Sequence, residues 1–93
     1  MSPSADVKTP KPLTSAQIRA ARALIRWSAE DLARESSLSV TTIRRAELTL
    51  SATQLTRVND QAVRRTLEAV GVEFIDADGG RGPGVRLRGS QQK

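Results

Sequence analysis

Apolar residues recur every three or four positions after Thr14, the spacing of one face of an α-helix. Thr14 is followed three residues later by Gln17, a capping box that begins many helices. The pattern predicts a first helix that continues to about Arg26. Trp27 follows directly and is predicted to be a core residue, with stacking on a base as the alternative. The apolar side of this helix is expected to contain Ile18, Ala21, Leu24 and Ile25.

Two short helices joined by a tight turn are predicted between Ser28 and Leu48. Ser28 is followed by Asp31, so its hydroxyl can accept from a free backbone N–H while the acid suits the positive end of a helix. Ser39 supplies a second capping hydroxyl, before a helix predicted over Val40 to Leu48. The residues expected to face the core of this pair are Leu32, Ala33, Leu38, Ile43 and Ala46.

The opposite side of the second short helix combines small and cationic side chains. At about 100° per residue, four residues share this side, with small ones at the N-terminal end and arginines further on. A protruding helix with such a face can enter the major groove of DNA and still hold phosphates. The four residues are Val40, Thr41, Arg44 and Arg45.

Helical spacing returns after a polar stretch, and a fourth helix is predicted from Val58 to Val70. Gly71 lies just past its end, where helices commonly stop. Either Asn59 or Thr56 is predicted to cap its start. The positions that follow the helical spacing are Ala62, Val63, Thr66, Leu67 and Val70.

After Gly71, apolar residues recur at every second position, which predicts a C-terminal β-hairpin. Its strands are expected at Val72–Ile75 and Val85–Arg88, with a turn-rich segment between them. Because an isolated two-stranded hairpin is marginally stable, it must pack on the helices, pair with a second copy, or do both. We expect it to contribute to a symmetric homodimer. The residues assigned to dimerisation are Val72, Phe74, Val85 and Leu87, which alternate onto one face.

The predicted fold class is mainly α: a four-helix helix-turn-helix domain with a C-terminal β-hairpin. Residues 14–71 form the domain and residues 72–88 the hairpin, flanked by disordered tails at 1–13 and 89–93. The N-terminal tail contains three prolines and little apolar surface. A solvated tail is favoured there, and a basic arm that touches phosphates through Lys8 and Lys11 is the alternative.

Charge and composition narrow the function classes. Fifteen Lys and Arg against ten Asp and Glu give a net charge of +5, and 12 of the cations are Arg, the better residue for phosphate and guanine. The absence of Cys and His removes disulfides, thiolate metal sites and the commonest general base. Since no nucleophile–base constellation is visible, we expect a protein that is not an enzyme and needs no cofactor or metal. No apolar run approaches the ~20 residues of a membrane span, so a cytoplasmic, nucleoid-associated protein is expected.

The stretch from about Gln17 to Glu47 resembles the helix-turn-helix of the Cro/C1-type regulators, also called the XRE family. The core positions of the two short helices match that family. Ala29 departs from it, because the family usually has a Gln there that braces the phosphate backbone. Ser37 stands where Gly is usual in the turn, at an expected cost of about 1 kcal/mol for a left-handed conformation. The resemblance also implies a structural, bidentate ion pair between Arg22 and Glu47.

The resemblance implies sequence-specific binding of double-stranded DNA, most simply by a dimeric repressor on an inverted-repeat operator. Arg44 or Arg45 would donate two hydrogen bonds to a guanine, and affinity would fall steeply with salt. The alternative is a helix-turn-helix interaction module, such as an antitoxin or adaptor, with a protein partner on the same surface. The residues assigned to DNA contact are Ser39, Val40, Thr41, Thr42, Arg44, Arg45, Ser28 and Glu30.

Overall fold

The computed structural model describes residues 11–89, which form four helices and one two-stranded antiparallel sheet. This part of the chain is mainly α, as predicted. The tail residues 1–10, with Lys8 among them, and 90–93 lie outside the described residues. The elements are α1 (Ser15–Ile25), α2 (Ala29–Ser36), α3 (Val40–Leu48), α4 (Arg57–Ala69), β1 (Val72–Ile75) and β2 (Gly84–Leu87).

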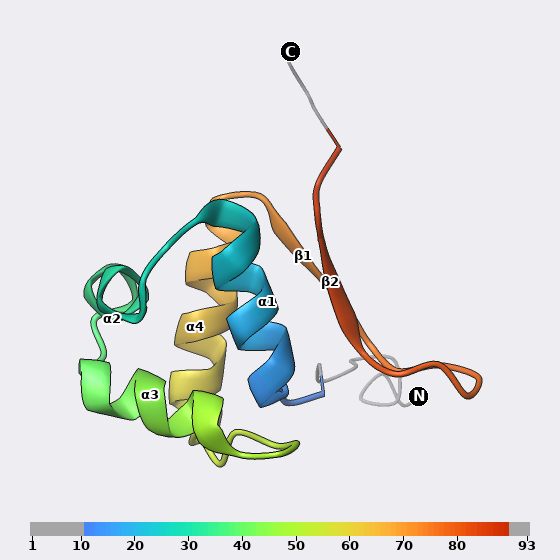
Figure 1. Ribbon diagram of the computed structural model, residues 1–93, viewed down its shortest axis with the longest axis horizontal. Coiled ribbons are helices and arrows are strands. Elements are labelled where there is room, and N and C mark those ends of the chain that lie inside the picture. Colours follow the sequence, from blue (N-terminus) through green and yellow to red (C-terminus); the bar gives the residue numbers. More distant parts are fainter. Residues whose placement is uncertain (1–10, 90–93) are drawn as a thin grey trace, which may run out of the picture.

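The sheet and the α2–α3 pair lie on opposite sides of α1 and α4 (Figure 1). α2 packs on α3 and α4, and α3 also packs on α1. Both strands contact α1, and β1 also contacts α4. In the described part of the chain, no helix has the length and apolar character needed to cross a membrane.

Every helix of the structure begins at a residue whose side chain accepts a hydrogen bond from the backbone three residues on. The Thr14 hydroxyl accepts from the Gln17 N–H at 3.1 Å, and the Gln17 side-chain oxygen accepts from the Thr14 N–H at 2.9 Å. These contacts satisfy donors that a helix start leaves unpaired. The alternative left open for α4 is resolved in favour of Thr56. The four caps are Thr14, Ser28, Ser39 and Thr56.

The turn between α2 and α3 contains a serine in the left-handed conformation. Ser37 has φ 63° and ψ 30°, and its neighbour Leu38 donates its N–H to the Ala33 carbonyl at 3.0 Å. This closure commonly uses Gly, because a β-carbon disfavours the left-handed region. The left-handed conformation predicted for Ser37, where related turns usually have Gly, is therefore confirmed.

Replacing Ser37 with glycine is expected to stabilise the protein by about 0.5 to 1 kcal/mol, because the left-handed penalty disappears and only part of it is offset by chain entropy. Urea denaturation of both proteins measures the difference. Ser39→Ala is the matched control: Ser39 has φ −76° and caps α3, so its loss should destabilise by about 1 kcal/mol. A Ser37→Gly protein no more stable than the parent would show that the turn carries no strain.

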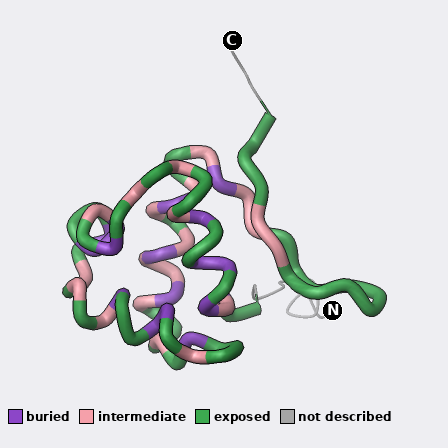
Figure 2. Tube along the Cα trace, in the orientation of Figure 1, coloured by how far each residue is buried: buried purple, intermediate pink, exposed green. Residues whose placement is uncertain are grey.

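The core is a single cluster drawn from all four helices, from β1 and from the segment before α1 (Figure 2). Trp27 is half-buried and packs against this cluster, which agrees with its prediction as core. The fully or nearly buried apolar residues are Leu13, Ile18, Ala21, Ala29, Leu32, Ala33, Ile43, Ala46, Val63, Leu67 and Val72.

The predicted N-terminal tail extends too far, because Leu13 belongs to the core. The Leu13 N–H donates to the Asp60 carboxylate at 3.0 Å, and the Lys11 carbonyl accepts from Arg64 at 2.7 Å. These contacts fasten the segment before α1 onto α4. Composition alone could not identify them, since the partners are 47 and 53 residues apart.

Two residues expected on apolar helix faces are exposed, namely Leu24 and Val70. Leu24 lies about 120° around α1 from the buried Ile18, which places it beyond the contact with the other elements. Val70 comes after the last helical residue, Ala69, where the chain turns towards β1. The apolar side of each helix is therefore narrower than the sequence pattern predicts.

The strands pair with Val72 opposite Leu87 and Phe74 opposite Val85, so these four residues share one face, as predicted. The second strand spans Gly84–Leu87, one residue earlier than expected.

That shared face packs on the protein's own helices, which leaves little of it exposed for the dimerisation assigned to its residues. Val72 is completely buried, Phe74 and Val85 pack against the core, and only Leu87 is largely exposed. The Gln17 amide donates to the carbonyls of Ile75 and Gly84 at 3.2 and 3.0 Å, fastening the sheet to α1. Alternation identifies an apolar face, but the element that covers it is set by the tertiary fold.

Candidate nucleic-acid interface

The exposed side of α3 is the first component of the candidate interface. Ser39 begins the helix, and its hydroxyl accepts from the Thr42 N–H at 3.0 Å. Ile43 and Ala46 are fully buried, so they fix one side of the short helix onto the core. The opposite side is thereby held outward, as the helical repeat predicts. The exposed residues on it are Thr41, Arg44, Arg45 and Leu48.

The N-terminal turn of α3 offers less exposed surface than predicted. Val40 is half-buried and packs against the core, because this turn lies close to α2. Thr42 is also half-buried, and its hydroxyl is 2.9 Å from that of Ser39. Thr41 is therefore the exposed small residue within α3, while Val40 and Thr42 have mainly structural contacts.

Arg45 borders a hollow of about 300 Å³ between α3 and the start of α4. Arg45 is exposed, and within residues 11–89 its guanidinium has no hydrogen-bond or ion-pair partner. Hydroxyl and amide groups around the hollow are suited to bonding phosphates or base edges. Asn59 was considered in the sequence only as a cap, yet it lines this hollow. The polar lining residues include Thr42, Thr49, Thr53, Gln54, Thr56 and Asn59.

Arg44 is paired with the protein's own Glu30, although the sequence analysis assigned both residues to DNA contact. Glu30 lies in the first turn of α2, and its carboxylate accepts from the Arg44 guanidinium. The side chains are 58% and 59% exposed, so the pair is on the surface. The Glu30 backbone N–H, followed by the charge of Arg44, holds the pKa of this carboxyl below its ordinary value. Glu30 and Arg44 are therefore brought together, but as an ion pair.

Ser28 caps α2 at the edge of the same surface. Its hydroxyl accepts from the Asp31 N–H, and its own N–H donates to the Asp31 carboxylate, both at 2.9 Å. The backbone N–H of Ser28 is the main reason that the pKa of Asp31 lies below its ordinary value. Ala29, the next residue, is nearly buried. Ser28 thus lies within the candidate surface, with its polar groups engaged in capping.

The ion pair between Arg22 and Glu47 is confirmed and links α1 to α3. Arg22 donates two hydrogen bonds to the Glu47 carboxylate, at 2.7 and 2.6 Å, and a third to the Trp27 carbonyl at 2.9 Å. The side chains are 22% and 9% exposed. The bond to Glu47 raises the pKa of Arg22 above its ordinary value. This pair fixes the position of α3 relative to α1.

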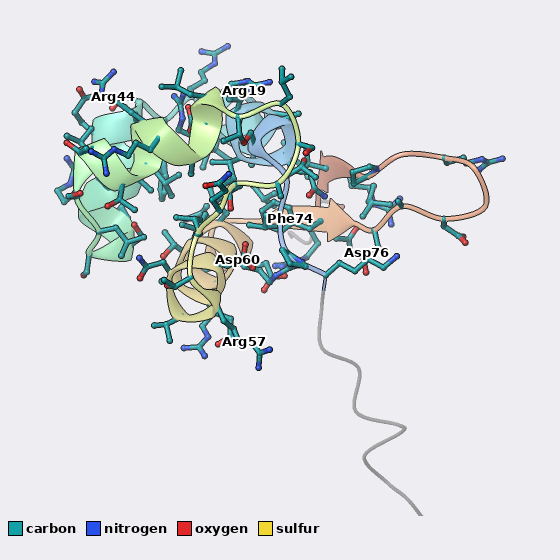
Figure 3. The ribbon with its side chains drawn as sticks, turned by 90° about the horizontal axis from the view of Figure 1, so that it is seen from below. Arg19, Arg44, Arg57, Asp60, Phe74 and Asp76 are labelled. Atoms are coloured by element: carbon teal, nitrogen blue, oxygen red, sulfur yellow. The ribbon has the colours of Figure 1, made fainter. Side chains whose placement is uncertain are left out.

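A second hollow, of about 380 Å³, lies where α1, α2 and α3 meet. Arg19 donates to the Glu47 carbonyl there, and Arg19 and Arg44 lie along the same edge of the molecule in Figure 3. Arg19 is not among the residues that the sequence analysis assigned to DNA contact. Its position three residues before Arg22, on the same side of α1, is the signal that indicates a shared site. The lining residues are Arg19, Arg22, Ala29, Arg44, Glu47 and Leu48.

Comparison of the chain with models of known protein families and with curated protein sequences finds no significant match to either.

Proposed function

We propose that this protein is a sequence-specific double-stranded DNA-binding transcriptional regulator of the Cro/C1 type. In this proposal α2 and α3 form the helix-turn-helix and α3 is the recognition helix. One observation carries it: Thr41, Arg44 and Arg45 are exposed on one side of α3, while Ile43 and Ala46 anchor the other side in the core. A short, firmly held helix with cations on its free side suits a major groove.

The charges around α3 support the same proposal. Arg45 can donate two hydrogen bonds to the O6 and N7 atoms of a guanine, a contact typical of sequence recognition. Thr56 lines the same hollow and is exposed, and its hydroxyl can donate to a flanking phosphate. A net charge of +5 favours association with a polyanion. Occupation of a promoter, and hence repression, is the simplest regulatory outcome of such binding.

We further propose that two copies bind one operator. A symmetric dimer would place two α3 helices on an inverted repeat whose half-sites are roughly one helical turn, ~34–36 Å, apart. Since the apolar side of the sheet is occupied by the protein's own core, the second copy would use another surface.

Selection of bound duplexes from a random-sequence library, followed by sequencing, tests the proposal. We expect enrichment of a short inverted repeat, with affinity for it falling steeply between about 50 and 200 mM salt. Enrichment of a single half-site would contradict the proposed dimer but support sequence-specific recognition. A library that stays random after selection would contradict sequence-specific binding.

A protein-interaction module, such as an antitoxin or adaptor, is the second candidate. The observation that favours it is apolar surface at the C-terminal end of α3: Leu48 is 79% exposed and Leu50 is fully exposed. Exposed apolar side chains supply surface that a partner protein can bury. Purification of the complex from cells would distinguish the two, because recovery of one stoichiometric protein with no enriched DNA would favour this candidate.

A further inference from the structure

All three guanidinium groups around the larger hollow are bonded to acceptors of the protein itself. Arg22 is bonded to the Glu47 carboxylate and the Trp27 carbonyl. Arg19 is bonded to the Glu47 carbonyl, and Arg44 to Glu30. These are the groups that would otherwise hold an anion at this surface.

The two acceptor carboxylates differ in how firmly they are held. Glu47 is buried and receives two hydrogen bonds from a largely buried arginine, so its displacement would leave two charges unpaired in a poorly hydrated position. Glu30 and Arg44 are both more than half exposed. Their ion pair links α2 to α3 across 14 positions of the sequence. Exposed ion pairs contribute little to stability, so this pair can open at small cost.

We propose that Glu30 is an internal competitor for polyanions at Arg44, which lowers the affinity of α3 for DNA of any sequence. The inference rests on the proposed function and adds a regulatory role for the Glu30 carboxylate. In the free protein Glu30 occupies the position that a phosphate would take at Arg44. A duplex that binds Arg44 must first displace this carboxylate from the guanidinium. Binding then depends more strongly on groups that read bases, such as Arg45.

The test compares Glu30→Gln with Glu35→Gln, each alone and combined with Arg44→Ala. Glu35 is an exposed carboxylate on the same helix, and it pairs with Arg34 at 3.6 Å instead of with α3. Both substitutions remove one negative charge, so their difference reports the contact with Arg44. Binding to a random-sequence duplex at low salt is measured by fluorescence anisotropy, and urea denaturation checks that each variant is folded.

We expect Glu30→Gln to raise affinity for the random duplex about two- to fivefold more than Glu35→Gln does. In the Arg44→Ala background the two substitutions should have equal effects, because the competed guanidinium is gone. Equal effects in the parent protein, or a Glu30→Gln gain that survives without Arg44, would overturn the inference.

A loss of affinity in Glu30→Gln would also overturn it and would assign Glu30 to a direct DNA contact, such as acceptance from a cytosine amino group. If the parent protein binds the duplex and Glu30→Gln leaves the affinity unchanged, only this inference fails. If the parent binds no duplex even at low salt, the proposed function itself fails.

Discussion

Replacing Glu47 with glutamine is expected to destabilise the protein by about 3 kcal/mol. Glu47 receives two charged hydrogen bonds from Arg22, and neither side chain is more than 22% exposed. Removal of one charge leaves the Arg22 guanidinium without its counter-ion in a poorly hydrated position, which costs more than the pair contributes. For a domain of this size the loss is a large fraction of the total stability.

Urea denaturation of the parent and the Glu47→Gln variant measures this effect, and Glu35→Gln is the matched control. Glu35 is exposed, so its substitution should change the free energy of unfolding by less than about 0.5 kcal/mol. Replacing both partners with apolar residues, in Arg22→Met with Glu47→Leu, should recover much of the loss. A Glu47→Gln variant within about 1 kcal/mol of the parent would show that the pair is not needed to position α3.

Arg45→Ala is expected to lower affinity for the selected operator by about 5- to 150-fold, the effect of losing one bidentate contact to a guanine. Affinity for random duplexes should fall much less, since only one cation is lost from a surface that carries several. Anisotropy titrations with both duplexes at the same salt concentration measure the two losses.

Arg65→Ala is the control for the charge itself, because Arg65 is an exposed cation on α4. This substitution should lower the affinity for both duplexes slightly and equally. If Arg45→Ala also lowers the affinity for the operator and for random duplexes equally, Arg45 is a phosphate contact and does not read sequence.

Local features of the fold were predictable from the sequence. The caps at Thr14, Ser28 and Ser39 depend on contacts between residues three positions apart, so a short window contains both partners. The left-handed conformation of Ser37 follows from its place just after a helix end. Periodicity likewise identified Ile43 and Ala46 as the buried side of α3.

Features that depend on tertiary contacts were not predictable in the same way. Leu13 follows a proline-rich stretch, yet it is buried in the core and its N–H bonds to Asp60 of α4, 47 residues away. Val72 lies on an apolar sheet face that α1 and α4 cover. The sequence pattern predicts this face but does not identify the helices that cover it. Glu30 and Arg44 are on different helices, so their pairing follows from the crossing of α2 and α3. The candidate interface was thus identified by its exposed residues, while its internal ion pair required the structure.

The most direct test of the central proposal is to map the DNA-binding surface by nuclear magnetic resonance. The backbone amides of the labelled protein would be followed as the selected duplex is added. We predict that the largest shifts occur on α3, at Thr41 and Arg45, and in the segment from Thr49 to Thr56 that lines the hollow beside it. Shifts confined to the sheet or to the outer side of α4, with α3 unaffected, would contradict the assignment of α3 as the recognition helix.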